Sequence, residues 1–257
     1  MYKKERQDTI LGILKENGYV TVDYLTKSLH YSTATINRDL NSLEKQGYIL
    51  RSYGGAELVK KNEVKLKFRY HKMKIAKRHI GKAAAAHIKP GDVIFIDGST
   101  TTEYMAPYLI AIPDITVITN NMSLTAYLSE NGTAVCCLGG KVYEAPYMLG
   151  GNETVICAHM HNADKMFFST IGFSEGGKIF EGGRFQLLHT IMMKNSKKIF
   201  YLADHEKSGF EGNIITADFG KVNHIISDYE FPDEIKAKYP DTVFEYVTDN
   251  KYSPTKK

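Results

Sequence analysis

The sequence contains few cysteines and no long apolar run. Its three cysteines, Cys136, Cys137 and Cys157, include one adjacent pair and no C-x-x-C pair. We therefore expect neither a disulfide framework nor a metal site, and small buried thiols in a reducing compartment are the simpler interpretation. No stretch approaches the roughly 18 apolar residues of a membrane helix. The first twenty residues are charged and helical in pattern, unlike a secretory signal, so we expect a cytoplasmic protein.

Glycine-rich nucleotide-binding motifs are also absent. The glycine pairs at 150–151, 176–177 and 182–183 give neither the G-x-G-x-x-G pattern of dinucleotide-binding folds nor a P-loop. A site for ATP or NAD is therefore not expected, and we predict no cofactor.

The positive charge is concentrated in one segment. The chain has a net charge of +4, yet residues 60–89 carry eleven Lys and Arg against Glu63 alone, which is a net charge of +10. Residues 1–59 carry +1 and residues 90–257 carry −7. A basic strip beside an acidic body indicates contact with a polyanion, although a solvated basic linker helix gives the same pattern.

Hydrophobic spacing in the first sixty residues predicts three helices and a hairpin. The expected helices cover residues 3–15, 22–30 and 33–46, and the expected strands cover residues 48–53 and 56–59. Thr21 and Ser32 would cap the second and third helices, and Gly54-Gly55 would form the tight turn. This order is typical of a winged helix-turn-helix, to which we assign residues 1–59.

The third expected helix has the composition of a DNA-reading helix. Ile36, Leu40 and Leu43 form a stripe to be buried. In the major groove Asn suits adenine and Arg suits guanine, while hydroxyls and helix-start N–H groups suit phosphates. The expected DNA-binding residues are Ser32, Thr33, Thr35, Asn37 and Arg38, with Arg51 and Tyr53 on the wing. In isolation these residues would be a solvated face, and Arg38 and Asp39 could also join structural ion pairs.

From residue 90 to residue 250, apolar strands alternate with helices. The expected strands cover residues 92–97, 115–119, 133–138, 165–171, 198–203, 222–227 and 242–247, and the expected helices cover residues 100–109, 123–129, 152–160, 185–195 and 233–238. Such alternation predicts an α/β fold with a Rossmann-like, mainly parallel sheet covered on both faces. Residues 60–89 would be a basic connector that becomes a helix, and residues 251–257 a polar tail.

Polar and glycine-rich segments follow the expected strands. The loop at 97–102 reads Asp-Gly-Ser-Thr-Thr-Thr and opens a helix, whose N–H groups and dipole favour a phosphate, although an ordinary polar cap has the same composition. Ligands of open α/β sheets bind at the carboxyl ends of strands, so these segments are expected to meet. The expected ligand-binding residues are Asp97, Gly98, Ser99, Thr100, Thr101, Asn120, Gly139, Gly140, Lys141, Gly172, Asp204 and Lys207.

Motifs in both halves resemble those of the DeoR family of bacterial repressors. They include Ser-Thr-Ala-Thr-Ile-Asn-Arg-Asp-Leu at 32–40, Arg-Ser-Tyr-Gly-Gly-Ala at 51–56, the loop at 97–102, Ala-Asp-Lys-Met-Phe at 163–167, and Ala203-Asp204 with Lys207. The resemblance covers about residues 3–250. It implies a repressor of a sugar-metabolism operon that binds double-stranded operator DNA as a homodimer or homotetramer and responds to a phosphorylated sugar. It also implies an effector domain similar in fold to ribose-5-phosphate isomerase and coenzyme A transferase domains.

The chain departs from the family pattern in three places. Asn37 stands where the family commonly has the first of two arginines. Gly98-Ser99 stands where the family usually has Ser-Gly. Residues 184–188 read Arg-Phe-Gln-Leu-Leu where an acidic residue and a Lys are common. The last departure removes polar side chains from the expected effector site, and Arg184 is the candidate replacement cation.

An enzyme is the competing interpretation. A sugar-phosphate isomerase fused to a DNA-binding module would need an acid/base carboxylate near the sugar, for which Asp97 and Asp204 with Lys207 are candidates. The family resemblance instead implies binding without turnover, so we expect no catalytic residues and no membrane partner.

Overall fold

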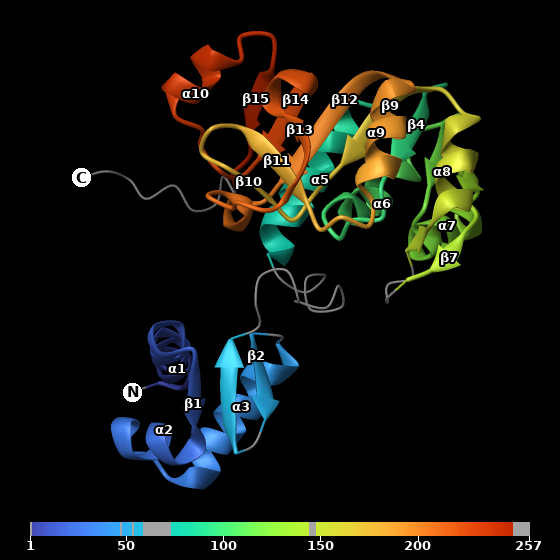
Figure 1. Cartoon of the computed structure of the whole chain (residues 1–257). Helices are drawn as coiled ribbons and strands as arrows, with labels where there is room; N and C mark the ends of the chain where they lie inside the picture. Colours follow the sequence, from blue (N-terminus) through green and yellow to red (C-terminus); the bar gives the residue numbers. More distant parts are fainter. Residues whose placement is uncertain (1, 47, 53, 59–72, 144–147, 249–257) are drawn as a thin grey trace. The chain divides into compact units, whose positions relative to one another are not determined.

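The computed structural model describes residues 2–46, 48–52, 54–58, 73–143 and 148–248 (Figure 1). The chain divides into two compact units, residues 1–72 and residues 73–257. Each unit is built around its own hydrophobic core. Residue 59, residues 60–72 of the expected connector, and the expected tail lie outside the described residues.

The N-terminal unit is a three-helix bundle closed by a small sheet. Its elements are α1 (Lys3–Asn17), β1 (Tyr19–Thr21), α2 (Val22–Leu29), α3 (Thr33–Lys45), β2 (Ile49–Ser52) and β3 (Gly55–Leu58). The strands pair antiparallel in the order β1-β3-β2. The prediction of a winged helix-turn-helix is confirmed, and β1 adds a third strand to the expected hairpin.

Capping residues and an apolar stripe explain how α2 and α3 form. The Thr21 hydroxyl accepts from the Tyr24 N–H at 3.1 Å, and the Ser32 hydroxyl accepts from the Thr35 N–H at 3.3 Å. Both caps satisfy backbone donors that a helix start leaves without a partner. The stripe of Ile36, Leu40 and Leu43 is buried in the core of this unit, as the sequence predicts. The opposite face of α3 is thereby left to solvent.

The C-terminal unit is built on a seven-stranded parallel sheet. In spatial order its strands are β15 (Val243–Tyr246), β14 (His224–Ser227), β12 (Ser196–Ala203), β9 (Ala163–Phe168), β4 (Val93–Ile96), β5 (Thr116–Thr119) and β6 (Ala134–Cys137). From β4 the chain builds towards β6, and from β9 it builds towards β15. The direction of winding therefore reverses between β4 and β9. Open α/β sheets bind ligands at the carboxyl ends of the strands at such a switch point, and we refer to this position as the crevice between β4 and β9.

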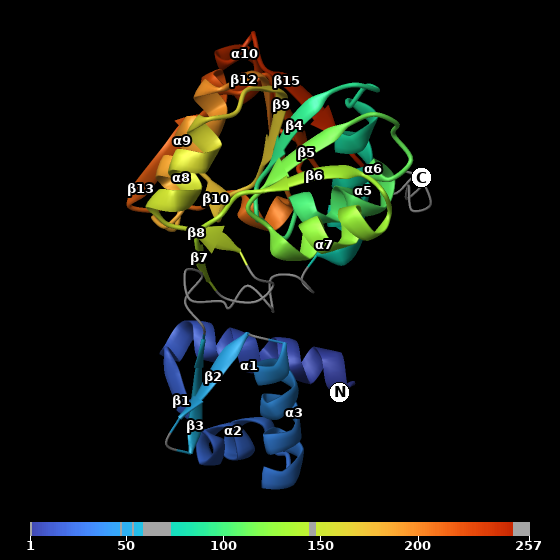
Figure 2. The ribbon, with the colours of Figure 1, turned by 90° about the vertical axis from the view of Figure 1, so that its right-hand side faces the viewer.

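Both faces of this sheet are covered (Figure 2). One face packs on α5 (Lys74–Ala86), η1 (Thr102–Met105), α6 (Ala106–Leu109) and α7 (Met122–Glu130). The other packs on α8 (Asn152–His159), α9 (Gln186–Lys194), α10 (Asp233–Lys238) and a second sheet. The predicted fold class is confirmed. No helix within the described ranges is long and apolar enough to cross a membrane.

The structure contains several short antiparallel strands that the sequence did not predict. They are β7 (Lys141–Val142), β8 (Leu149–Gly150), β10 (Gly172–Phe173), β11 (Lys178–Glu181) and β13 (Ile214–Asp218). Most are too short to show a hydrophobic alternation. The helix expected over residues 100–109 also begins later, as the 3₁₀ turn η1 at Thr102. The loop before it is correspondingly longer, and that loop is the centre of the site described next.

Candidate functional sites

The first site is the solvent-facing side of α3. Ser32, Thr33 and Arg38 are exposed, and Thr35 and Asn37 are half-buried. The hydroxyls of Ser32 and Thr35 lie 3.0 Å apart within the helix cap. The expected DNA-binding residues of this helix therefore all lie in its N-terminal half, and none belongs to the buried stripe.

The wing arginine lies against this helix. One terminal nitrogen of Arg51 donates to Asn37 Oδ1 at 2.6 Å and the other donates to Asn41 Oδ1. The fork of the guanidinium thus fixes two side-chain amides on α3. Because the Asn37 oxygen accepts from Arg51, its NH₂ group is the end left to donate to a base. The expected wing residue Tyr53 lies outside the described residues.

A basic groove extends along the same side of α3. It has a volume of about 440 Å³ and is lined by Lys3, Arg38, Asn41, Ser42, Lys45 and Gln46. Three of these six side chains are cationic, and no acidic side chain lines the groove. Such a surface suits the phosphate backbone of a nucleic acid.

Asp39 has a structural role. Its side chain is 2% exposed and accepts from Arg6 Nε at 2.5 Å, which joins α3 to α1. The Arg6 guanidinium also lies over the Tyr31 ring, 4.7 Å from its centroid. Of the two residues that could have formed structural ion pairs, Asp39 does so and Arg38 stays exposed.

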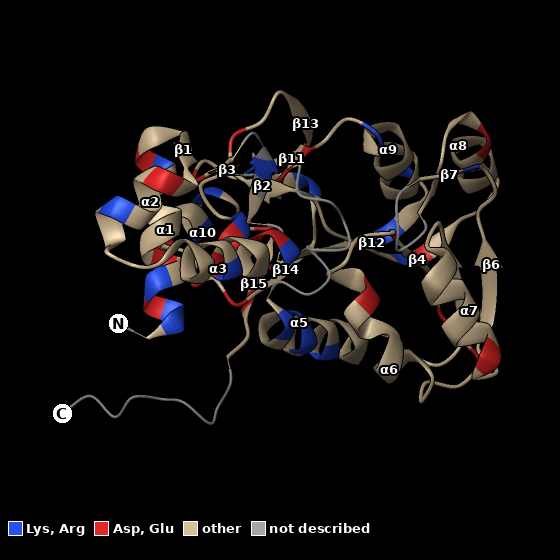
Figure 3. Ribbon diagram, turned by 90° about the horizontal axis from the view of Figure 1, so that it is seen from below, with Lys and Arg blue, Asp and Glu red and all other residues tan. Residues whose placement is uncertain are grey.

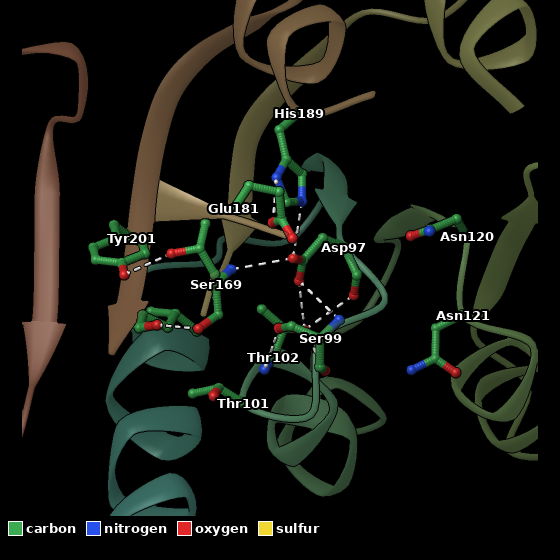
Figure 4. Close-up of polar contacts among 12 residues, drawn as sticks. Asp97, Ser99, Thr101, Thr102, Asn120, Asn121, Ser169, Glu181, His189 and Tyr201 are labelled. Carbon is green, nitrogen blue, oxygen red and sulfur yellow. Dashed lines mark hydrogen bonds and ion pairs between the residues drawn. The ribbon is translucent and has the colours of Figure 1, made fainter. Parts of the chain in front are cut away.

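The second site lies at the crevice between β4 and β9. Asp97 follows β4 and is buried, and its carboxylate accepts four hydrogen bonds (Figure 4). The Ser99 N–H and the Thr102 hydroxyl donate to Oδ1 at 3.2 and 2.8 Å. The Ser169 N–H and His189 Nε2 donate to Oδ2 at 3.2 and 3.1 Å. Asp97 therefore ties the loop after β4 to the loop after β9 and to α9.

Backbone donors remain available in the loop after β4. Within the described ranges, no residue accepts a hydrogen bond from the backbone N–H groups of Gly98, Thr100 or Thr101. The Thr102 hydroxyl oxygen, which donates to Asp97 Oδ1, also lies 3.0 Å from the carbonyl oxygens of Asp97 and Ser99, so the loop is a closed turn. Several free backbone donors in such a turn favour an anion.

Two lysines reach the same loop. Lys77 of α5 is buried and donates to the Thr100 hydroxyl at 3.1 Å. Lys207 donates to the Thr101 hydroxyl at 3.3 Å, to the Ser169 hydroxyl at 2.5 Å and to the Thr170 carbonyl at 2.7 Å. Two positive charges thus lie beside a loop of backbone donors.

A buried histidine lies on the other side of Asp97. His189 Nδ1 is 3.4 Å from Glu181 Oε2. This distance allows an ion pair, but the two atoms do not form a hydrogen bond. Burial by itself lowers the pKa of His189. The hydrogen bond to Asp97 and the charges of Glu181 and Asp97 outweigh burial, so the pKa is raised above 6.5. His189 therefore lies between two carboxylates, and both favour its protonated form.

The amide of Asn120, at the end of β5, faces the Asp97 loop (Figure 4). Asn120 is 1% exposed, and its Nδ2 donates to the Leu149 carbonyl at 2.8 Å. Its Oδ1 is buried with no hydrogen-bond partner among the described residues. A buried acceptor without a donor is costly, so this oxygen is suited to a ligand hydroxyl or a water.

Met148 covers Gly98 in this structure. A Cβ placed on Gly98 would lie 2.6 Å from Met148 Sδ and 3.3 Å from Asn120 Nδ2. Met148 immediately precedes β8 and bridges to Asn121. The β7–β8 hairpin thus lies over the loop, and the Gly98-Ser99 order leaves room for its methionine.

The remaining expected ligand-binding residues lie at the edges of this crevice. Gly139 and Gly140 are exposed and contact α8, where the Thr154 hydroxyl donates to the Gly139 carbonyl. Lys141 is exposed in β7, with its Nζ 5.7 Å from the centroid of Tyr143. Gly172 packs so closely on Phe210 that a Cβ would lie 2.3 Å from it. Asp204 is buried directly after β12.

Sequence reasoning missed Lys77, Glu181 and His189. In the sequence, the buried Lys77 stands among the exposed basic residues Lys74, Arg78 and Lys82. Figure 3 shows the basic residues of α5 in blue. His189 directly follows Leu187-Leu188, the apolar departure from the family pattern. Leu188 is a core residue and Leu187 is exposed, so the polar contact comes from the next position. Arg184, the candidate replacement cation, is exposed and lies over the Tyr143 ring at 5.4 Å instead.

Comparison with known proteins covers both units. Residues 6–62 match the family model described as DeoR-like helix-turn-helix domain, and residues 72–229 match DeoR C terminal sensor domain. The HTH-type transcriptional repressor GlcR of Bacillus subtilis (strain 168) is 32% identical over 231 residues, which are 89% of each protein. The L-fucose operon activator of Haemophilus influenzae is 33% identical over 239 residues, 90% of this chain and 94% of that protein.

Among solved structures, the ribose 5-phosphate isomerase of Plasmodium falciparum aligns with 53% of each chain at 13% identity and a TM-score of 0.39, a likeness too low to bear on function. The family models account for the two units separately, and the relatives align across nearly the whole chain. This chain belongs to the DeoR family of helix-turn-helix transcription regulators.

Proposed function

We propose that this regulator represses a sugar-metabolism operon and that a phosphorylated sugar, bound at the crevice between β4 and β9, changes its operator affinity. The relatives include a repressor and an L-fucose operon activator by name. The observation that carries the effector proposal is the loop after β4, where backbone donors of Gly98, Thr100 and Thr101 lie beside Lys77 and Lys207.

The phosphate would be held by that loop. Three N–H groups with no protein acceptor among the described residues can each donate to a phosphate oxygen, and two ammonium groups balance its charge. Lys207 is already oriented by the Ser169 hydroxyl and the Thr170 carbonyl, so less side-chain entropy is lost on binding.

The sugar would extend from the loop towards β5. The Asn120 oxygen can accept from a sugar hydroxyl, which would give a donor to a buried acceptor that lacks one. Met148 covers Gly98 on this path, and its long unbranched side chain can change rotamer at little cost. We therefore expect the β7–β8 hairpin to move when the effector binds.

The hydrogen bonds of Asp97 favour binding over catalysis. A carboxylate offers about four lone-pair sites, and the carboxylate of Asp97 already accepts four hydrogen bonds from the protein. It has no lone pair left with which to take a substrate proton. Lys207 donates to three oxygens, which suits a cation rather than a base.

A thermal-shift screen tests the effector proposal. Phosphorylated sugars and sugar alcohols are each compared with the unphosphorylated compound, because a specific ligand raises the melting temperature by mass action. We expect one phosphorylated compound to stabilise the chain and its free sugar not to do so. Lys207→Met should abolish the shift, while Lys82→Met, an exposed lysine of α5, should leave it intact. A shift that survives Lys207→Met, or none with any phosphorylated compound, would refute this site.

A further inference from the structure

Three side chains of the kinds that commonly bind metals meet at the C-terminal end of α5. His87 is the C-cap residue of α5, His224 opens β14, and Glu245 lies in β15. One ligand atom from each lies within 4.8 Å of those of the other two, and all three residues are half-buried. His87 Nε2 is 2.7 Å from Glu245 Oε2, and the two imidazole rings have centroids 5.0 Å apart.

The sheet and its core fix the direction of these side chains. Ile226 and Val247 lie two residues beyond His224 and Glu245 and pack in the core on the α5 side of the sheet. Because strand side chains alternate, His224 and Glu245 face the same side. The His224 ring is stacked on Phe200, with centroids 4.7 Å apart and planes 15° apart. Both strand residues therefore face the end of α5 that carries His87.

One donor atom in this cluster has no partner. His224 Nδ1 is buried and has no hydrogen bond among the described residues, although an imidazole nitrogen normally finds one. A buried imidazole nitrogen beside a second imidazole and a carboxylate is the donor set that zinc uses, with an open fourth position for water. Ligand atoms around tetrahedral zinc lie about 3.4 Å apart. Small side-chain rotations would bring atoms now within 4.8 Å to that spacing.

We propose that His87, His224 and Glu245 bind a divalent transition metal of the zinc class, which ties the C-terminal end of α5 to β14 and β15. The site is separate from the effector crevice. His87 is ten residues from Lys77, which is about 15 Å along a helix at a rise of 1.5 Å per residue. The metal would hold in place the helix that also supplies Lys77 to the effector loop.

The cysteines offer a competing location for a soft metal. Cys136 Sγ lies 3.8 Å from His161 Nε2, and Cys157 is close enough to interact electrostatically with Cys136. A binding experiment must separate these two locations. Glu245→Gln and His224→Gln remove ligands of the proposed site, and Cys136→Ser removes one from the competing location.

The experiment titrates zinc into the chelator-treated full-length chain by calorimetry and follows visible absorption with Co²⁺. We expect one zinc per chain, a raised melting temperature and the absorption of tetrahedral Co²⁺. Glu245→Gln and His224→Gln should weaken zinc binding by more than about a hundredfold, because loss of even an outer-shell partner costs about 10–100-fold. Cys136→Ser should bind as the unaltered chain does.

Three outcomes would overturn the proposal. They are no zinc binding by the unaltered chain, binding that persists in both Glu245→Gln and His224→Gln, and binding that Cys136→Ser abolishes. Melting of each variant without metal shows that it is folded, and Glu245→Gln keeps the size of the side chain if His224→Gln does not fold. A phosphorylated sugar that fails to bind would leave this result unaffected, since the two sites share no residue.

Discussion

At the scale of single residues, the hydrogen bond from Arg51 to Asn37 leads us to predict that the wing takes part in reading DNA. Arg51→Ala and Asn37→Ala should each weaken operator binding by about 1–3 kcal/mol if the Asn37 amide reads a base. The double variant should lose less binding free energy than the sum of the two single losses, because Arg51 acts by holding the Asn37 oxygen. Fluorescence anisotropy with operator DNA measures the affinities of the two single variants and of the double variant.

Lys15→Ala on α1 serves as the control for this experiment. Strict additivity of the two losses would mean that Arg51 and Asn37 contact DNA independently.

The raised pKa of His189 gives a second prediction at this scale. Its pKa in the folded protein is raised above 6.5, so protonation stabilises the fold. That stabilisation is fully present below about pH 6.5 and is lost as the pH rises through the raised pKa. The difference in unfolding free energy between the unaltered chain and His189→Gln should therefore shrink over this range. Urea unfolding at several pH values measures it, with His159→Gln at the exposed end of α8 as the control. A difference that does not change with pH would contradict the charged form.

At the scale of elements, one ion pair joins the first and third helices. Arg6→Met would leave Asp39 buried without its counter-ion, because Asp39 is 2% exposed and pairs with Arg6. We expect a loss of about 3 kcal/mol in the stability of the N-terminal unit, the lower end for a broken buried pair. Circular dichroism during denaturant unfolding measures this loss. Lys27→Met is the control, since it breaks the exposed pair with Asp23 and should cost less than about 0.5 kcal/mol.

The elements also show what the sequence could and could not reveal. Periodicity identified the helices and the seven parallel strands, because each buries one face or both. The strands β7, β8 and β10 were missed, since two residues carry no period. The loop at 97–102 was found from its position after an apolar strand. Lys77 and His189 were not identified from the sequence, because only the tertiary fold brings α5 and α9 to that loop.

At the scale of the whole molecule, we predict self-association through exposed apolar side chains at α8 and α9. Ile156 and Met160 at α8 and Leu187 on α9 are 63%, 78% and 54% exposed, and these two helices pack together. Large exposed apolar groups on neighbouring elements often mark an interface. A dimer would carry two winged units, which is the number that the two half-sites of a palindromic operator require. Leu187→Ser with Met160→Ser should shift the chain towards monomer in sedimentation equilibrium, and Ile110→Ser on the opposite face should not. An unchanged mass would place any interface elsewhere.

The coupling between effector and operator must act in both directions. If the effector changes operator affinity by a factor of about 5–150, operator DNA must change effector affinity by the same factor, because both report one coupling free energy. Calorimetric titration of the effector with and without operator, and anisotropy titration of the operator with and without effector, measure the two factors. Arg38→Ala should weaken operator binding and leave the affinity for the effector alone unchanged, since Arg38 lines the groove on α3. Equal effector affinity with and without operator would show that the sugar phosphate binds without controlling DNA, whatever its affinity.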